Sequence, residues 1–208
     1  MNRPAMSHAK SLLRKAVIAA LAPFALSACN APADSPPAQG PLVGAAIGGD
    51  FTLTGEDGQT VRWRDFAGQW RVVYFGYTFC PDVCPVDAAA IGQGLSRFEK
   101  QAPGLGAKVT PLFITVDPAR DTPAVLREFT ANFHPRMLGL TGSEAQIAET
   151  AKKFAVWYQK GEPAPGGGYL VNHTNQAVLF DPDGKPIALL PTDKGGPAVA
   201  EELAKWVK

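Results

Sequence analysis

Two cysteines separated by three residues, Cys80 and Cys84, are the side chains whose type and spacing best suit chemistry. They follow the apolar run from Val72 to Phe75, which predicts a strand buried on both faces of a sheet, so the thiols are expected just beyond a strand end. Pro85 is typical of a first helical position, which places Cys84 near a helix N-terminus, where the helix dipole favours a thiolate. Such a pair can close a small disulfide or direct two sulfur atoms at one soft metal ion, and the spacing does not choose between these.

The elements that must position this pair alternate between strand and helix patterns. A hairpin around Asp57-Gly58 is expected first, then the strand that precedes the cysteines and a helix after them. Further strands are predicted at 109–116, 175–180 and 187–190, and helices after Thr122-Pro123, near Ser143 and around Leu203. The order strand, helix, strand, helix, helix, strand hairpin, helix predicts an α/β protein with a mixed sheet.

The stretch 159–172 is rich in Gly and Pro and has no periodicity, so it is predicted to be a loop. It leads directly to His173, which stands just before the predicted strand at 175–180. We therefore expect the loop to deliver this histidine to the start of that strand.

The first 28 residues have the composition of an export signal. Four basic residues precede the apolar run 16–28, and no acidic residue occurs before Asp34. The run ends in Leu26-Ser27-Ala28-Cys29, which resembles the lipobox of bacterial lipoproteins and implies that Cys29 is lipidated. An ordinary cleaved signal peptide is the alternative, and a transmembrane anchor is disfavoured because the run is shorter than the roughly 20 residues that span a bilayer.

Residues 29–41 are predicted to be the lipidated cysteine and a Pro-rich tether, and residues 42–208 a single domain. The domain is expected to be held at a bacterial membrane and to face the periplasm or the cell exterior. Removing residues 1–28 takes away four of the 20 basic residues and none of the 19 acidic ones, which moves the formal net charge from +1 to −3. This charge argues against nucleic acid as a partner.

Several blocks of the sequence together resemble the Sco/SenC family, over most of residues 45–207. The blocks, in the family's order, are Tyr74-Phe75-Gly76-Tyr77-Thr78-Phe79-Cys80-Pro81-Asp82-Val83-Cys84-Pro85, Asp117-Pro118-Ala119-Arg120-Asp121-Thr122-Pro123, His134-Pro135-Arg136, Gly139-Leu140-Thr141-Gly142, Tyr169-Leu170-Val171-Asn172-His173-Thr174 and Asp181-Pro182-Asp183-Gly184. A strand that leads to two cysteines at a helix start, followed by a hairpin and a terminal helix, also looks like the thioredoxin fold.

The resemblance implies a copper-binding accessory protein that helps to assemble the dinuclear copper site of cytochrome c oxidase subunit II. It implies copper ligation by Cys80, Cys84 and His173, together with a copper donor protein and a thiol reductant as partners. Phe79 stands where a histidine often precedes the first cysteine, and Asn172 where an aspartate often precedes the histidine. Neither position is a family copper ligand, so the resemblance implies that binding persists and that affinity or partner recognition differs.

The implied ligands are chemically consistent with Cu(I), because soft sulfur favours this ion and it accepts three ligands. Zinc would take a fourth ligand, and neither His134 nor Met137 can be placed near the thiols from sequence. His134 is instead interpreted as a loop or capping residue, and His8 leaves with the signal peptide. For His173 the alternative to a ligand is a hydrogen-bonded loop histidine.

Four charged residues near the motifs are expected to have structural roles. Asp82 is expected to cap the helix or to stay solvated, with an influence on the electrostatics of the site as its second interpretation. Asp117, Arg120 and Asp121 follow the strand at 109–116, where they are expected to form an ion pair and to have no catalytic role.

Three other functions compete with copper delivery. A thiol–disulfide oxidoreductase would reduce the cysteines of the target site without carrying metal, and it would not need His173. A thiol peroxidase would want a Pro and a Thr placed upstream of the reactive cysteine, yet position 73 is valine and Thr78 lies only two residues before Cys80. An inert disulfide in a binding domain would show no metal affinity when reduced.

Overall fold

The computed structural model describes residues 39–163 and 168–208. The predicted signal peptide, the proposed lipidation site Cys29 and most of the predicted tether lie outside these residues. Within the described ranges no helix is both long and apolar enough to cross a membrane.

A seven-stranded mixed sheet forms the centre of the fold, in the strand order β2-β1-β5-β4-β3-β8-β9. Its strands are β1 Thr52–Gly55, β2 Thr60–Arg62, β3 Trp70–Gly76, β4 Val109–Thr115, β5 Leu138–Thr141, β8 Ala177–Phe180 and β9 Pro186–Leu190. β3 pairs parallel with β4 and antiparallel with β8, while β4 pairs parallel with β5. The mixed sheet and the N-terminal hairpin of β1 and β2 agree with the sequence prediction.

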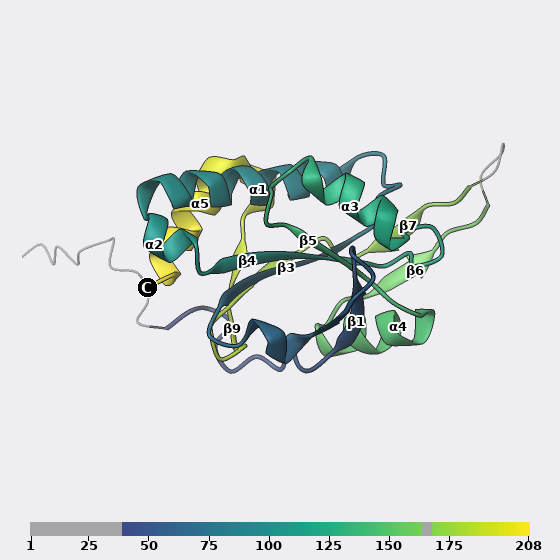
Figure 1. Cartoon of the computed structure of the whole chain (residues 1–208), viewed down its shortest axis with the longest axis horizontal. Helices are drawn as coiled ribbons and strands as arrows, with labels where there is room; N and C mark the ends of the chain where they lie inside the picture. Colours follow the sequence, from purple (N-terminus) through teal and green to yellow (C-terminus); the bar gives the residue numbers. More distant parts are fainter. Residues whose placement is uncertain (1–38, 164–167) are drawn as a thin grey trace, which may run out of the picture. The chain divides into compact units, whose positions relative to one another are not determined.

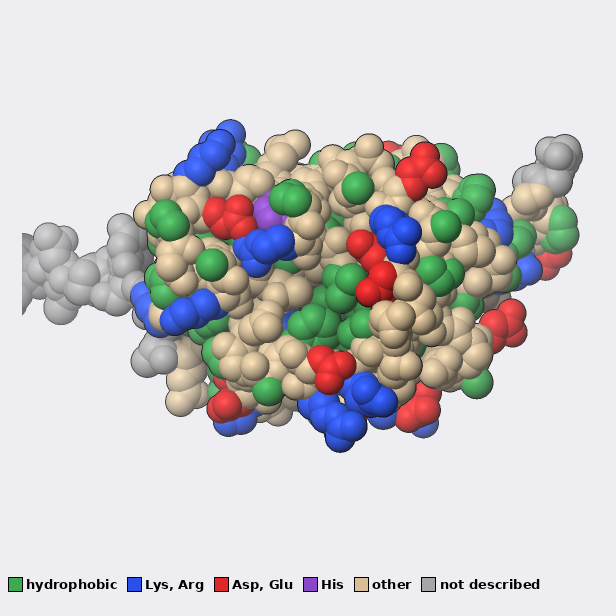
Figure 2. Space-filling view, in the orientation of Figure 1, with side chains coloured by type: hydrophobic (Ala, Val, Ile, Leu, Met, Phe, Trp, Pro, Cys, Tyr) green, Lys and Arg blue, Asp and Glu red, His purple; other side chains and the backbone are tan. Residues whose placement is uncertain are grey.

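Helices cover both faces of this sheet. They are α1 Val83–Gln101, α2 Pro103–Gly106, α3 Pro123–Ala131, α4 Glu144–Lys153 and α5 Gly195–Trp206, with short 3-10 turns η1 Trp63–Phe66 and η2 Thr192–Lys194. Figure 1 shows α1, α3 and α5 on one face and α4 on the other. On the face turned to the viewer, acidic and basic side chains are interspersed rather than gathered by sign (Figure 2).

The central strand β3 is buried along its whole length, as its continuous apolar run predicts. Alternation along the strand sends neighbouring side chains to opposite faces. Phe75 packs on Phe154 at the end of α4, with ring centroids 5.7 Å apart, whereas Tyr74 reaches Asp87 of α1. β3 therefore ties the helix that follows the cysteines to the core on both sides of the sheet.

The helix starts that carry clear capping signals were predicted correctly. The Thr122 hydroxyl accepts a hydrogen bond from the Val125 N–H, and Pro123 is the first residue of α3. Ser143 and Gln146 form a reciprocal capping box at the start of α4. α1, in contrast, begins at Val83, two residues before the proline expected to start it.

The sequence prediction missed one strand of the main sheet. β5 lies between α3 and α4, where two consecutive helices were expected, and it also pairs antiparallel with β1. It has only four residues, one of them Gly139, so it lacks the sustained apolar run that marks a strand.

The predicted loop 159–172 is wrong at both ends. β6 Tyr158–Lys160 and β7 Val171–His173 pair antiparallel as a second, two-stranded sheet, seen at one end of the domain in Figure 1. Backbone hydrogen bonds from Gly161 N to Leu170 O (2.7 Å) and from Thr174 N to Trp157 O (2.9 Å) extend this hairpin. Cross-strand hydrogen bonding makes these residues extended, although their sequence shows no alternation of polar and apolar positions.

The start of the packed domain lies slightly before the expected boundary at residue 42. Gly40 is buried, and a side chain there would overlap Ile187 of β9. The Leu42 N–H also donates to the Ile187 carbonyl at 3.0 Å. The last residues of the predicted tether thus contact the sheet edge.

Candidate metal centre

The two cysteines lie where β3 ends and α1 begins. Gly76 closes the strand, and a Cβ at this position would come within 2.8 Å of Tyr74 and 3.0 Å of Phe113, so a larger residue here would press on two core rings. Cys80 lies in the connecting loop and is partly exposed, whereas Cys84 lies in the first turn of α1 and is fully buried. Both are free thiols.

Cys80 has the environment of a reactive thiol. Burial raises the pKa of Cys80, but main-chain N–H groups at the start of α1 outweigh this effect, so the net pKa lies below its ordinary value. One of these donors is the Cys84 N–H, 3.4 Å from the Cys80 sulfur. The exposed sulfur is therefore the one that ionises more readily.

Cys84 and His173 meet in the interior of the site. The Cys84 Sγ lies 3.2 Å from His173 Nε2, across 89 residues of sequence. The other ring nitrogen, Nδ1, lies 2.9 Å from the Thr174 carbonyl, to which it donates, so Nε2 keeps its lone pair toward the thiol. Burial raises the pKa of Cys84 and lowers the pKa of His173, which favours a neutral thiol donating to a neutral imidazole.

Three further side chains hold the histidine, and sequence reasoning missed them. The rings of Tyr74 and Tyr77 stand edge-on to His173, with centroids 6.4 Å and 5.9 Å away. Tyr74 also donates from its hydroxyl to the buried carboxylate of Asp87, at 2.9 Å. Asp87 lies one turn after Cys84 on α1, and this spacing was the one sequence signal that would have placed its carboxylate beside the site.

Asp121 holds the cysteine loop through hydrogen bonds. Its buried carboxylate accepts hydrogen bonds from the Thr78 N–H (3.1 Å), the Thr78 hydroxyl (2.6 Å) and the Thr115 hydroxyl (2.6 Å). Burial raises the pKa of Asp121 and outweighs these bonds. The residue ties the loop two positions before Cys80 to the end of β4. An ion pair was expected among Asp117, Arg120 and Asp121, and Arg120 pairs with Asp117 rather than with Asp121.

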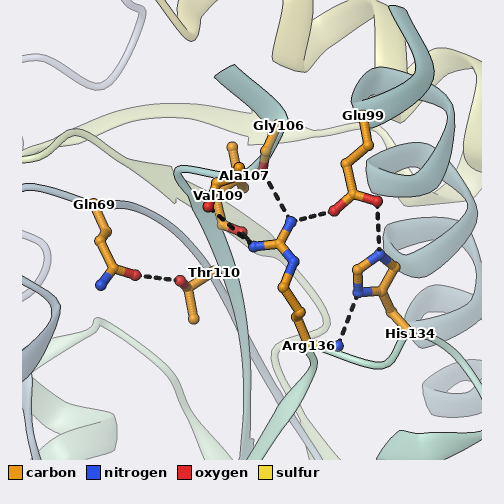
Figure 3. A network of polar contacts seen from close by, with 8 residues as sticks. All are labelled: Gln69, Glu99, Gly106, Ala107, Val109, Thr110, His134 and Arg136. Atoms are coloured by element: carbon orange, nitrogen blue, oxygen red, sulfur yellow. Dashed lines mark hydrogen bonds and ion pairs between the residues drawn. The ribbon is translucent and has the colours of Figure 1, made fainter. Parts of the chain in front are cut away.

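The other residues discussed from sequence lie elsewhere or have local roles. His134 is buried and contacts Glu99 and Arg136 rather than either thiol (Figure 3). Asp82 occupies the N-cap position of α1 and is exposed, but its side chain makes no capping hydrogen bond. Arg120 pairs with Asp117, as predicted.

The donor atoms fit a soft metal ion, but they are not yet arranged around one. Among residues 39–163 and 168–208, no group of three or more His, Cys, Asp or Glu side chains is placed to hold a metal ion. The Cys84 sulfur contacts His173 Nε2 directly, whereas the Cys80 sulfur accepts a hydrogen bond from the main-chain N–H of Cys84. Binding by all three would require the Cys84 thiol to lose its proton.

Known proteins resemble this chain over about two thirds of its length. The chain is 45% identical over 141 residues to the mitochondrial SCO2 homolog of Bos taurus, which covers 67% of this chain and 52% of the relative. It is also 45% identical over 141 residues to the SenC protein of Rhodobacter capsulatus. That match covers 66% of this chain and 60% of the relative. The chain spans about half the length of the curated relatives it matches.

Solved structures of Sco proteins also resemble this chain. The structure of Arabidopsis thaliana ScoI with copper bound superposes with a TM-score of 0.71 at 33% identity, covering 77% of this chain and 97% of that one. Two more distant structures show the fold alone: BsSco, described as a member of the Sco family of cytochrome c oxidase assembly proteins (24% identity, TM-score 0.59), and a thioredoxin domain of a Bacteroides vulgatus thiol-disulfide oxidoreductase (16%, 0.53). The fold is thioredoxin-like, and since the SCO1/SenC family model matches residues 39–208, the chain belongs to the SCO1/SenC family.

Proposed function

We propose that this protein binds one copper ion through Cys80, Cys84 and His173 and delivers it to, or prepares, the dinuclear copper site of cytochrome c oxidase subunit II. The observation that carries the proposal is the 3.2 Å contact between Cys84 Sγ and His173 Nε2 beside a partly exposed second thiol. Two thiolates and one imidazole form a soft, low-coordinate site that suits Cu(I). The copper-bound Sco relative supports the choice of metal.

The two thiols differ in a way that suits transfer. Cys80 is accessible and has the lower pKa, while Cys84 is enclosed with His173. An incoming thiolate of a copper donor or a target therefore meets Cys80 first, and the buried pair retains the metal during exchange.

The proposal places the domain at a membrane through lipidated Cys29, with the tether that follows it. The predicted export signal and lipobox support this placement, and a solved SCO1/SenC family protein from Bacillus anthracis is described as a lipoprotein. A copper donor protein and a thiol reductant complete the set of proposed partners, because Cu(I) binding needs both cysteines reduced.

The test is anaerobic Cu(I) competition against a chelator, with the reduced full-length chain and its Cys80→Ser and His173→Ala variants. We expect one copper per chain, bound tightly enough to compete, and a sharp loss of affinity in both variants. Asp82→Asn is the matched control, because this exposed residue lies between the cysteines without contributing a ligand. Affinity unchanged by His173→Ala would overturn the ligand set.

A second candidate is thiol–disulfide exchange, which the accessible, low-pKa Cys80 favours. The Cys80 thiolate would attack a target disulfide to form a mixed disulfide, and Cys84 would then attack Cys80 and release the target dithiol. The pair ends oxidised by two electrons, and the thiol reductant restores it. In this case His173→Ala would retain activity on a disulfide substrate, whereas Cys80→Ser would have none.

A further inference from the structure

The hairpin that carries His173 is separate from the main sheet. β6 and β7 pair only with each other among the described strands. A pocket of about 490 Å³ lies beside the hairpin, lined by Asp117 after β4, by Ala145 and Ala148 of α4 and by Tyr158 and Val171 of the hairpin. This space separates part of the hairpin from α4, so the contacts that hold His173 against Cys84 lie on the side of the cysteine loop.

Arg120 makes contacts on that side. Its guanidinium lies 3.8 Å from the ring centroid of Tyr169, which precedes β7, and 4.9 Å from the ring of Phe79, the residue before Cys80. Asp117 pairs with this guanidinium and accepts a hydrogen bond from the Tyr169 hydroxyl at 2.7 Å. We call the four residues Phe79, Asp117, Arg120 and Tyr169 the latch.

Apart from its ion pair with Asp117, Arg120 lies against aromatic rings. Its Nη2 atom is buried and has no hydrogen-bond partner among the described residues, although a guanidinium carries five N–H donors. A planar cation between aromatic rings is attracted by their negative faces, and this attraction strengthens as water is excluded. Phe79 supplies the aromatic ring of this contact on the cysteine loop.

We propose that Arg120 is a positioning residue, which joins the cysteine loop to the hairpin and so sets the distance between Cys84 and His173. The latch links residues on both sides of the site, since Phe79 is next to Cys80 and Tyr169 lies four residues before His173. A second link, from the Val171 N–H to the Tyr77 hydroxyl at 3.3 Å, joins the same two segments. The consequence for copper affinity rests on the proposed function, whereas the position of the hairpin does not.

The first test needs no copper. In the reduced full-length chain, Arg120→Met is expected to accelerate amide hydrogen exchange at Val171 about tenfold while the amides of β4 keep their protection. Lys160→Met is the matched control, because Lys160 Nζ also lies 3.8 Å from the Tyr169 ring but belongs to the hairpin itself. Unchanged exchange in Arg120→Met, or equal acceleration in both variants, would overturn the proposal.

The second test asks whether Arg120 acts through His173. Arg120→Met is expected to lower Cu(I) affinity roughly tenfold, as for residues that orient a metal ligand, but less than twofold in a His173→Ala background. Phe79→His is expected to retain affinity within twofold, and Phe79→Ala to lose about as much as Arg120→Met. Equal losses in both backgrounds would overturn the proposal. If the unaltered chain binds no Cu(I), the proposed function fails. The hydrogen-exchange test still shows whether Arg120 positions the hairpin.

Discussion

Two histidines in this domain have opposite environments. His134 uses both ring nitrogens within the protein: Nδ1 accepts the Arg136 N–H at 3.1 Å, and Nε2 lies 3.3 Å from Glu99 (Figure 3). His173 donates from Nδ1 to the Thr174 carbonyl and directs the lone pair of Nε2 at the Cys84 thiol. A histidine that bonds a carboxylate and a main-chain N–H stabilises the fold, whereas one whose Nε2 contacts a thiol can share a metal ion with that sulfur once the thiol proton leaves.

The surroundings of His134 explain its role. Arg136 pairs with Glu99 and donates to the carbonyls of Val109 (2.7 Å) and Gly106 (2.9 Å), so one cluster joins α1, α2, the start of β4 and the segment before β5 (Figure 3). Such a cluster fixes where β5 enters the sheet. The ring of His173 packs on Tyr74 and Tyr77 instead.

The largest effect is expected from His173→Ala. Loss of one of three ligands should lower Cu(I) affinity by more than about 100-fold, beyond the roughly 10- to 100-fold typical of residues that only orient a ligand. This corresponds to more than about 2.7 kcal/mol. Chelator competition measures the affinity, and thermal unfolding of the copper-free variant should show little change.

The reverse pattern is expected for His134→Ala. This substitution leaves the Arg136 N–H and one oxygen of Glu99 without their partner and should lower the free energy of unfolding by about 2 kcal/mol. Cu(I) affinity of the folded variant should match that of the unaltered chain. Urea unfolding measures the free energy of unfolding, and the same chelator assay measures the affinity. A large loss of Cu(I) affinity in His134→Ala would contradict the assignment of His134 to the fold and of His173 to the metal ion.

A smaller effect is expected from Tyr74→Phe. The variant keeps the ring beside His173 but removes the hydrogen bond to Asp87, so Cu(I) affinity should fall about tenfold or less. Asp87→Asn tests the same contact from the other side. Effects of the two variants that add fully in the double variant would show that the hydrogen bond between them has no role.

The smallest effect concerns pH. Burial raises the pKa of Glu99, but hydrogen bonds from Arg136 and His134 outweigh it, so the net pKa lies below its ordinary value of 4.5. The ionised carboxylate therefore stabilises the fold above pH 4.5, and this contribution is lost as the pH falls through the lower folded pKa. Urea unfolding between pH 7 and pH 3 should show a steeper decline for the unaltered chain than for Glu99→Gln, and equal slopes would contradict this.

The parts of the structure that local signals determine were predictable from sequence. The buried β3 strand, the caps at Thr122 and Ser143 and the position of the two cysteines all follow from residues within a few positions of each other. The short strand β5 and the hairpin of β6 and β7 were not, because they depend on pairing with partners elsewhere in the chain rather than on their own pattern.

The site shows the same division. Cys80 and Cys84 can be found from their spacing, but the contact between Cys84 and His173 spans 89 residues, and only the family resemblance pointed to that histidine. From residue types alone His173 could be a ligand or a hydrogen-bonded loop histidine, whereas His134 was interpreted as a loop or capping residue. What separates them is the use of the second ring nitrogen, which depends on Glu99 and Thr174 and appears only once the chain is folded.

The central claim is that His173 Nε2, and not His134, binds the metal ion. The most direct measurement is nitrogen-15 NMR of the histidine side chains in the reduced full-length chain during an anaerobic Cu(I) titration. We expect the Nε2 resonance of His173 to shift until one equivalent is bound while both nitrogens of His134 stay unchanged. A shift of His134, or no shift of His173 at full copper loading, would contradict the account.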